Sequence, residues 1–244
     1  MKKLLVHLHL FYLDQWPYFR DKLVNIEDCD WDFFVTVCES ENYEEYETLQ
    51  SVKEEILKFK PDTKIIEVNN EGFDILPFLT VIKSVNLDDY DFVMKLHTKG
   101  IRSDIIDLNG IPFCGAFWLK RLVDSMLFSK GLFKQNLAII SKEDFGMVCD
   151  SFFFMKLMNY PEDTYLLAQL KQQLHVTSNL DQFLAGSMFM IRASILKRLQ
   201  NLDLHSAGES SSGMIGTWYH AVERIFTILT VDEGYKIFKV PMFY

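Results

Sequence analysis

Apolar positions follow two alternating patterns along the first hundred residues. Short runs rich in β-branched and aromatic residues are typical of buried strands, and longer runs with an apolar residue at every third or fourth position are typical of helices. The predicted strands are residues 4–12, 31–38, 64–68 and 91–96, and the predicted helices are residues 16–25, 44–58 and 75–85. This alternation predicts an α/β fold with a mainly parallel central sheet flanked by helices.

The second half of the chain is less regular. Its predicted helices are residues 117–133, 163–173 and 218–226, and its predicted strands are residues 146–149 and 183–192. Small residues within the last strand, at 185–187, indicate that a ligand or another backbone comes close there. The apolar run 152–158 favours the core, with a lid, an acceptor-lipid surface or a partner surface as alternatives. Without a repeat or a clear linker, we expect one domain over residues 1–244.

Charge narrows the range of ligands. The chain has 25 Lys and Arg against 34 Asp and Glu, a formal net charge of −9, so its surface as a whole should repel nucleic acid. Any anion site must therefore be local. The four cysteines have no CxxC spacing, which favours reduced structural thiols and a cytoplasmic protein. The alternating start of the chain favours a strand over a signal peptide, and no apolar run reaches the ~18 residues of a membrane span.

Cationic and hydrogen-bonding residues follow the fourth predicted strand. Lys95, His97, Thr98 and Lys99 lie where that strand ends. In an open parallel sheet the ligand crevice lies at the carboxyl ends of the strands, so these side chains should meet those of the first strand and of the loop 69–74. The pattern predicts an anion site for a phosphorylated ligand.

Each of these residues also has a structural interpretation. Lys95 and Lys99 could be ordinary charges at a strand end. His7 and His9, which alternate with apolar residues, could pack inside the fold. Asp74 could cap the helix that begins at residue 75.

Four motifs then occur in a distinctive order. They are Asn70-Glu-Gly-Phe-Asp-Ile-Leu-Pro-Phe78, Tyr90-Asp-Phe-Val-Met-Lys-Leu-His-Thr-Lys99, Ala185-Gly-Ser-Met-Phe-Met-Ile-Arg192 and His220-Ala-Val-Glu-Arg-Ile-Phe226. In these motifs the chain resembles the rhamnan synthesis protein F family, which comprises bacterial glycosyltransferase-like proteins of cell-surface polysaccharide assembly. The resemblance covers nearly the whole chain.

The resemblance implies a GT-A-like single domain and an enzyme. Its expected activity is transfer of a rhamnose-like deoxysugar from a nucleotide-diphosphate donor to a growing surface polysaccharide such as the O-antigen of lipopolysaccharide. Residues 1–100 would form the nucleotide-sugar-binding half, and residues 101–244 the acceptor and catalytic half. The acceptor would be a glycan or a lipid-linked glycan, which leaves peripheral association with the inner face of the membrane open.

The residues expected to contact the donor come from the motifs and from the first strand. They are His7, His9, Asn70, Gly72, Asp74, Lys95, His97, Thr98, Lys99, Arg102, Gly186 and Ser187.

Two departures from the family pattern bear on the donor. Glu71 and Phe73 stand where the family loop usually carries arginine, and Gly100-Ile-Arg-Ser103 stands where Lys-Ser is common. Arg102 is expected to compensate in part. The altered loop keeps a second hypothesis open, namely a non-catalytic glycan-binding or polysaccharide-assembly module with a degenerate donor site.

The strand end also suggests how a leaving group would be stabilised. Many GT-A enzymes carry Asp-x-Asp there, which binds a divalent metal that neutralises the departing diphosphate. This chain has Lys95-Leu-His-Thr-Lys99 at that place. Fixed cations can stabilise the same charge, so we expect transfer without a metal or other cofactor.

An inverting transferase needs a carboxylate that accepts the proton of the acceptor hydroxyl. We predict Glu223 for this role, with Asp181 as the alternative. His220 lies three residues before Glu223 on the same helix face and could tune it. The alternative is that Glu223 and Arg224 form an ordinary ion pair.

Overall fold

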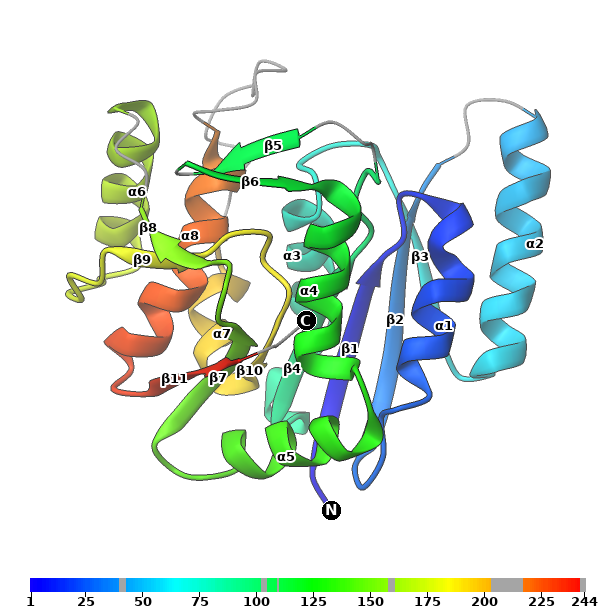
Figure 1. The fold of residues 1–244 in the computed structure, drawn as a ribbon, viewed down its shortest axis with the longest axis horizontal. Coiled ribbons are helices and arrows are strands. Elements are labelled where there is room, and N and C mark those ends of the chain that lie inside the picture. Colours follow the sequence, from blue (N-terminus) through cyan, green and yellow to red (C-terminus); the bar gives the residue numbers. More distant parts are fainter. Residues whose placement is uncertain (40–42, 102–104, 109, 158–160, 203–216, 242–244) are drawn as a thin grey trace.

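A seven-stranded sheet forms the centre of the protein (Figure 1). The computed structural model describes residues 1–39, 43–101, 105–108, 110–157, 161–202 and 217–241. In sheet order the strands are β11 (Lys236–Val240), β7 (Phe145–Asp150), β10 (Phe189–Arg192), β4 (Phe92–His97), β1 (Lys3–His9), β2 (Asp30–Cys38) and β3 (Lys64–Val68).

Most neighbouring strands run parallel. β1 pairs in parallel with β2 and β4, β2 with β3, and β7 with β11. Only β10 is antiparallel within this sheet, where it pairs with both β4 and β7. The predicted class, an α/β fold with a mainly parallel central sheet flanked by helices, is confirmed.

Helices cover both faces of the sheet (Figure 1). One face is covered by α1 (Trp16–Leu23), α4 (Gly115–Leu127) and α5 (Lys130–Ile140), and the other by α3 (Ile75–Ser84), α7 (Ala193–Gln200) and α8 (Trp218–Asp232). The remaining helices are α2 (Tyr43–Phe59) beside the β3 end of the sheet and α6 (Pro161–Gln173), which packs on α8. Between β1 and β4 the chain switches from one face to the other, which opens a crevice at their carboxyl ends.

Two sequence predictions were wrong in detail. The predicted helix 117–133 is two helices, because Ser129 begins α5 and its Oγ accepts a hydrogen bond from the Leu132 backbone N–H (3.2 Å). The predicted strand 183–192 is interrupted between β9 (Gln182–Leu184) and β10 by a turn in which φ is +92° at Gly186 and +44° at Ser187. The hairpin of β5 (Ile105–Leu108) and β6 (Ile111–Cys114), helix α7 and strand β11 were not predicted.

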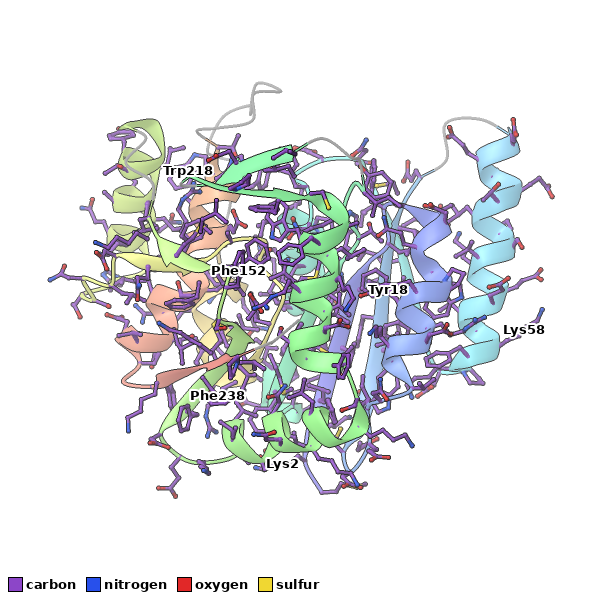
Figure 2. All side chains as sticks on the ribbon, viewed as in Figure 1. Lys2, Tyr18, Lys58, Phe152, Trp218 and Phe238 are labelled. Atoms are coloured by element: carbon purple, nitrogen blue, oxygen red, sulfur yellow. The ribbon has the colours of Figure 1, made fainter. Side chains whose placement is uncertain are left out.

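Aromatic and aliphatic side chains fill the space between the sheet and the helices (Figure 2). In the apolar run 152–158, Phe153 and Met155 belong to this core, Phe152 is exposed, and residue 158 lies outside the described residues. Phe153 is fully buried, and its ring centroid lies 4.9 Å from that of Phe113. Phe154–Lys156 forms β8, which pairs with β9. Among the helices that the structure describes, none combines the length and the apolar character that a bilayer crossing requires.

Candidate functional site

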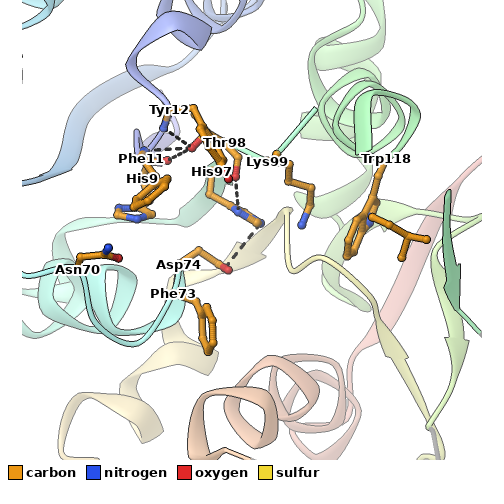
Figure 3. Close-up of a pocket in the computed structure, with 12 residues that line it drawn as sticks. His9, Phe11, Tyr12, Asn70, Phe73, Asp74, His97, Thr98, Lys99 and Trp118 are labelled. Carbon is orange, nitrogen blue, oxygen red and sulfur yellow. Dashed lines mark hydrogen bonds and ion pairs between the residues drawn. The ribbon is translucent and has the colours of Figure 1, made fainter. Parts of the chain in front are cut away.

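A cavity of about 790 Å³ opens at the carboxyl ends of β1 and β4 (Figure 3). The loops after β1, β3 and β4 converge here, as predicted. The cavity is lined by His9, Phe11, Tyr12, Asn70, Phe73, Asp74, His97, Thr98, Lys99, Gly100, Ile106 and Trp118. Six of these were predicted donor contacts: His9, Asn70, Asp74, His97, Thr98 and Lys99.

Polar side chains from β1 and β4 share one face of the sheet beneath the cavity. His7 pairs in register with Lys95, and His9 pairs with His97. The Phe78 ring of α3 lies 5.6 Å from both the His7 ring and the Lys95 ammonium, so this face is the one that α3 covers. The alternation of polar and apolar residues in the two strands therefore places four polar side chains under a helix.

Lys95 is a fully buried cation with three oxygen partners. Its ammonium donates to Asp74 Oδ2, to Ser187 Oγ (2.9 Å) and to the Ser187 carbonyl (3.2 Å). Ser187 Oγ in turn donates to Asp74 Oδ2 (2.7 Å). A buried charge is tolerated when it is paired and hydrogen-bonded, which is the case here. The structure thus places Lys95 and Ser187 behind the cavity wall instead of in its lining.

Asp74 occupies the N-cap position directly before α3, yet its side chain makes no capping hydrogen bond. The alternative interpretation of Asp74 as a helix cap is therefore wrong. Burial opposes ionisation, but the His97 imidazole and the ammonium groups of Lys95 and Lys99 hold the pKa of Asp74 well below its ordinary value. Asp74 is a permanent anion that binds the buried Lys95 and also reaches the cavity.

His97 and Glu223 hold the peptide groups of Gly186. His97 Nε2 donates to the Gly186 carbonyl (2.7 Å), and the Gly186 N–H donates to Glu223 Oε1 (2.8 Å). A glycine is required at this turn, because a Cβ atom would lie 2.6 Å from Leu122 Cδ1 at a φ of +92°. Burial lowers the pKa of His97 well below its ordinary value, while the neighbouring Asp74 carboxylate opposes the shift.

These contacts join all four sequence motifs in one network. The first motif contributes Asp74, and the second contributes Lys95 and His97. The third contributes Gly186 and Ser187, and the fourth contributes Glu223. Residues that are distant in sequence therefore depend on one another for their positions.

The two histidines of β1 share one hydroxyl. Thr36 Oγ1 lies 2.9 Å from His7 Nε2 and 3.0 Å from His9 Nδ1. His7 is fully buried and does not line the cavity, which fits the packed interpretation, whereas His9 lines the cavity. Burial lowers the pKa of His9 to about 4, so its imidazole is neutral near pH 7.

Lys99 lines the cavity, whereas Lys95 lies behind its wall and is bound to Asp74. The Lys99 ammonium lies 3.6 Å from the centre of the Trp118 ring and, within the described residues, has neither a hydrogen bond nor an ion pair. Figure 3 shows it between Thr98 and Trp118. Burial lowers the pKa of Lys99 to about 8, so most molecules carry the charge at pH 7. A cavity cation in this state can bind an anionic ligand.

The other predicted residues lie around the cavity or away from it. Glu223 is partly buried beside the Gly186 turn and does not line the cavity. His220 bonds through Nδ1 to Thr217 Oγ1 (2.8 Å). Asp181 is exposed before β9, outside the cavity lining. Arg102 lies outside the described residues.

Sequence reasoning missed the aromatic part of the lining. Phe11 and Tyr12 directly follow β1, and Thr98 Oγ1 accepts hydrogen bonds from their backbone N–H groups (3.0 and 3.2 Å). Their position after a strand that ends at the crevice was a usable signal. Trp118 gave no such signal, since its contact with Lys99 depends on the packing of α4 against the sheet.

The described side chains do not fit a divalent cation. No three or more His, Cys, Asp or Glu side chains within the described ranges are grouped as a metal site would require. The carboxylate of the cavity, Asp74, is bound to Lys95 and lies near Lys99. Divalent cations of the Mg²⁺ and Ca²⁺ type need several oxygen ligands, and neighbouring ammonium groups would repel them.

Comparisons with known proteins identify related sequences and folds. The model of the family described as rhamnan synthesis protein F matches residues 1–235. The protein WxcX of Xanthomonas campestris pv. campestris, described as uncharacterized, is 27% identical over 177 residues, which are 69% of this chain and 24% of WxcX. The chain thus spans about a quarter of the length of the curated relatives it matches.

Two solved structures are similar over most of the chain. The S. aureus protein TarS, residues 1–349, is 12% identical with a TM-score of 0.45, over 92% of this chain and 54% of that one. The mannosyltransferase PcManGT from Pyrobaculum calidifontis, in complex with GDP-Man and Mn2+, is 14% identical with a TM-score of 0.44, over 98% of this chain and 54% of that one.

Proposed function

Because the chain belongs to the rhamnan synthesis protein F family, we propose that it is a glycosyltransferase that moves a sugar from a nucleoside-diphosphate donor to a glycan acceptor. The observation that carries the proposal is the ammonium of Lys99, which reaches a large cavity and forms no ion pair with any residue that the structure describes. The finer proposal is a rhamnose-like deoxysugar as donor, and as acceptor a bacterial surface polysaccharide assembled at the inner face of the membrane.

The donor diphosphate would bind at Lys99, with the neutral imidazole of His9 and the amide of Asn70 as further polar groups of the cavity. Charge builds up on the diphosphate as the glycosidic bond breaks. A fixed cation in a partly desolvated site stabilises that charge without rearrangement of the protein. Since the described side chains do not fit a divalent cation, we propose that Lys99 replaces a metal.

The acceptor hydroxyl would attack the anomeric carbon as the bond to the diphosphate oxygen breaks. Its proton would pass to the Glu223 carboxylate, and the electron pair of the broken bond would leave with the diphosphate. The Gly186 N–H holds Oε1 of Glu223, which orients the carboxylate beside the cavity. Asp181 is less suited, because it is exposed before β9, whereas Glu223 contacts the Gly186 turn, which is bound to the cavity residue His97.

Nucleotide binding tests this function directly. Melting temperatures would be measured with UDP, GDP and dTDP and their sugar conjugates, each with EDTA and with Mn2+. A ligand that binds only the folded protein raises its stability, so at least one nucleotide should raise the melting temperature in EDTA. No response to any of them would refute the donor site and favour a glycan-binding or assembly module. A response only with Mn2+ would refute metal independence alone.

The pH dependence of binding follows from Lys99. Its pKa is lowered to about 8, so the charge that attracts a diphosphate is present below pH 8 and is lost above it. We expect the affinity for the responding nucleotide to fall by about tenfold between pH 7 and pH 9.5. Isothermal titration calorimetry would measure this. In Lys99→Met the affinity should be low and flat over the same range, and a flat profile in the unaltered protein would contradict the assignment.

Glu223→Gln distinguishes the proposed role of Glu223 as a base from its contact with the Gly186 N–H. The glutamine side-chain oxygen can still accept the Gly186 N–H, whereas the amide cannot take a proton. We expect the transfer rate to fall by about 10²–10⁴ while the nucleotide affinity stays within about twofold. Glu223→Ala should lose the contact as well and lower the melting temperature. Unchanged turnover in Glu223→Gln would exclude Glu223 as the base.

A further inference from the structure

Phe73 is an exposed aromatic residue in an unfavourable backbone conformation. Its side chain lines the cavity, and the residue is 57% exposed. Its φ angle is +55°, in the left-handed region that bulky residues rarely adopt and that Gly, Asn and Asp tolerate. Folding alone would favour a small or polar residue at this position. A strained residue on a cavity wall points instead to a role in function.

The glycine before Phe73 brings the loop close to α8. At Gly72, where φ is +69°, a Cβ atom would lie 2.4 Å from Leu76 Cβ and 2.8 Å from Tyr219 Cε1. The loop therefore packs tightly against Tyr219 directly before Phe73.

The ring of Phe73 is held on its α8 side. Its centroid lies 6.4 Å from that of Tyr219, edge to face, and 5.6 Å from that of His220, tilted. His220 is itself fixed by Thr217. The remaining surface of the Phe73 ring is available to a ligand, and a rigid aromatic ring gives contact area at little entropic cost.

The charge of the loop and the position of Phe73 in the cavity indicate which substrate contacts its ring. Glu71, two residues before Phe73, makes this loop unfavourable for a phosphate. In Figure 3, Phe11 and Tyr12 lie above Asp74, whereas Phe73 lies below it. Phe73 thus lies on a different side of Asp74 from Phe11 and Tyr12, and the Phe73 side suits a neutral ring.

We propose that Phe73 is the platform on which a pyranose ring of the acceptor glycan stacks. The carbon-hydrogen face of the sugar would lie on the phenyl ring, and its hydroxyl groups would point toward the polar centre of the cavity. This inference rests on the proposed glycosyltransferase function and names the residue that binds its second substrate.

Phe73→Asn tests the platform, because asparagine tolerates the left-handed conformation and removes the ring. Saturation-transfer NMR would measure binding of methyl glucoside, methyl mannoside, methyl galactoside and methyl rhamnoside, as pyranosides, to the full chain. At least one should bind the unaltered protein, and its affinity should fall at least tenfold in Phe73→Asn. Phe73→Tyr should retain it. The melting temperature of Phe73→Asn should equal or exceed that of the unaltered protein.

Phe128→Asn is a matched control, since Phe128 is similarly exposed (54%) and lies outside the cavity lining. It should leave pyranoside binding unchanged. Nucleotide affinity, measured separately, should stay within twofold in Phe73→Asn. A loss of nucleotide affinity would assign the ring to the donor and overturn the proposal. Unchanged pyranoside binding in Phe73→Asn would also overturn the platform, and so would the absence of pyranoside binding to the unaltered protein. A failure of the proposed donor site would be seen separately, as absent nucleotide binding.

Discussion

Lys95→Met is expected to lower the free energy of unfolding by about 3–5 kcal/mol, as the loss of one partner of a buried ion pair does. Lys95 is fully buried, and its ammonium holds Asp74 Oδ2 together with the side chain and backbone of Ser187. Methionine fills a similar volume, so the loss comes from the charge left on Asp74 and not from a cavity. Urea denaturation followed by circular dichroism would measure it.

Two further variants define the origin of this loss. Lys3 and Asp32 form a partly exposed pair at 3.1 Å, with side chains 36% and 32% exposed, so Lys3→Met should cost no more than about 1 kcal/mol. Adding Asp74→Asn to Lys95→Met removes the orphaned charge and should restore part of the stability. If Lys95→Met costs as little as Lys3→Met, the buried network does not have the charges assigned to it.

Lys99→Met is expected to have the opposite profile, with a large loss of activity and no loss of stability. Removal of one donor that stabilises transition-state charge costs about 10²–10³ in turnover. The ammonium has no hydrogen bond or ion pair to the described residues, and burial disfavours its charge, so the fold should not depend on it. Steady-state transfer assays, on the donor found by the nucleotide panel, and urea denaturation would measure the two effects.

A conservative variant and a distant one serve as controls for Lys99→Met. Lys99→Arg keeps the cation and should retain more activity than Lys99→Met. Lys236→Met removes an exposed lysine that pairs with Asp144 (2.9 Å) at the start of β11, and it should leave turnover unchanged. Full activity in Lys99→Met would show that another group stabilises the leaving diphosphate.

The contrast between the two lysines shows how far the site could be predicted. Lys95 and Lys99 were predicted together because both follow the same apolar run, and in sequence nothing distinguishes their roles. In the structure Lys95 points from within β4 to the face under α3, whereas Lys99 lies beyond the strand end beside Trp118. Burial of a strand residue depends on the helix that covers its face, and that helix is distant in sequence.

Glu223 and Gly186 show the same limit. Sequence reasoning found both residues and predicted a strand through Gly186, since small residues in an apolar run do not show where a strand turns. The turn forms because Gly186 must fit against Leu122 and because His97 and Glu223 bind its peptide groups. Each of these partners comes from another element of the fold.

The sequence by itself determined the alternating strands and helices of the first hundred residues, the mainly parallel sheet and the crevice where polar strand ends meet, because side-chain period and chain connectivity are local properties. It also determined the family, through four ordered motifs. Only the tertiary structure decided which of those polar groups neutralise one another and which remain for a ligand. Pairing depends on distances across the fold, and those distances arise when α3, α4, α8 and the Gly186 turn pack around the ends of β1 and β4.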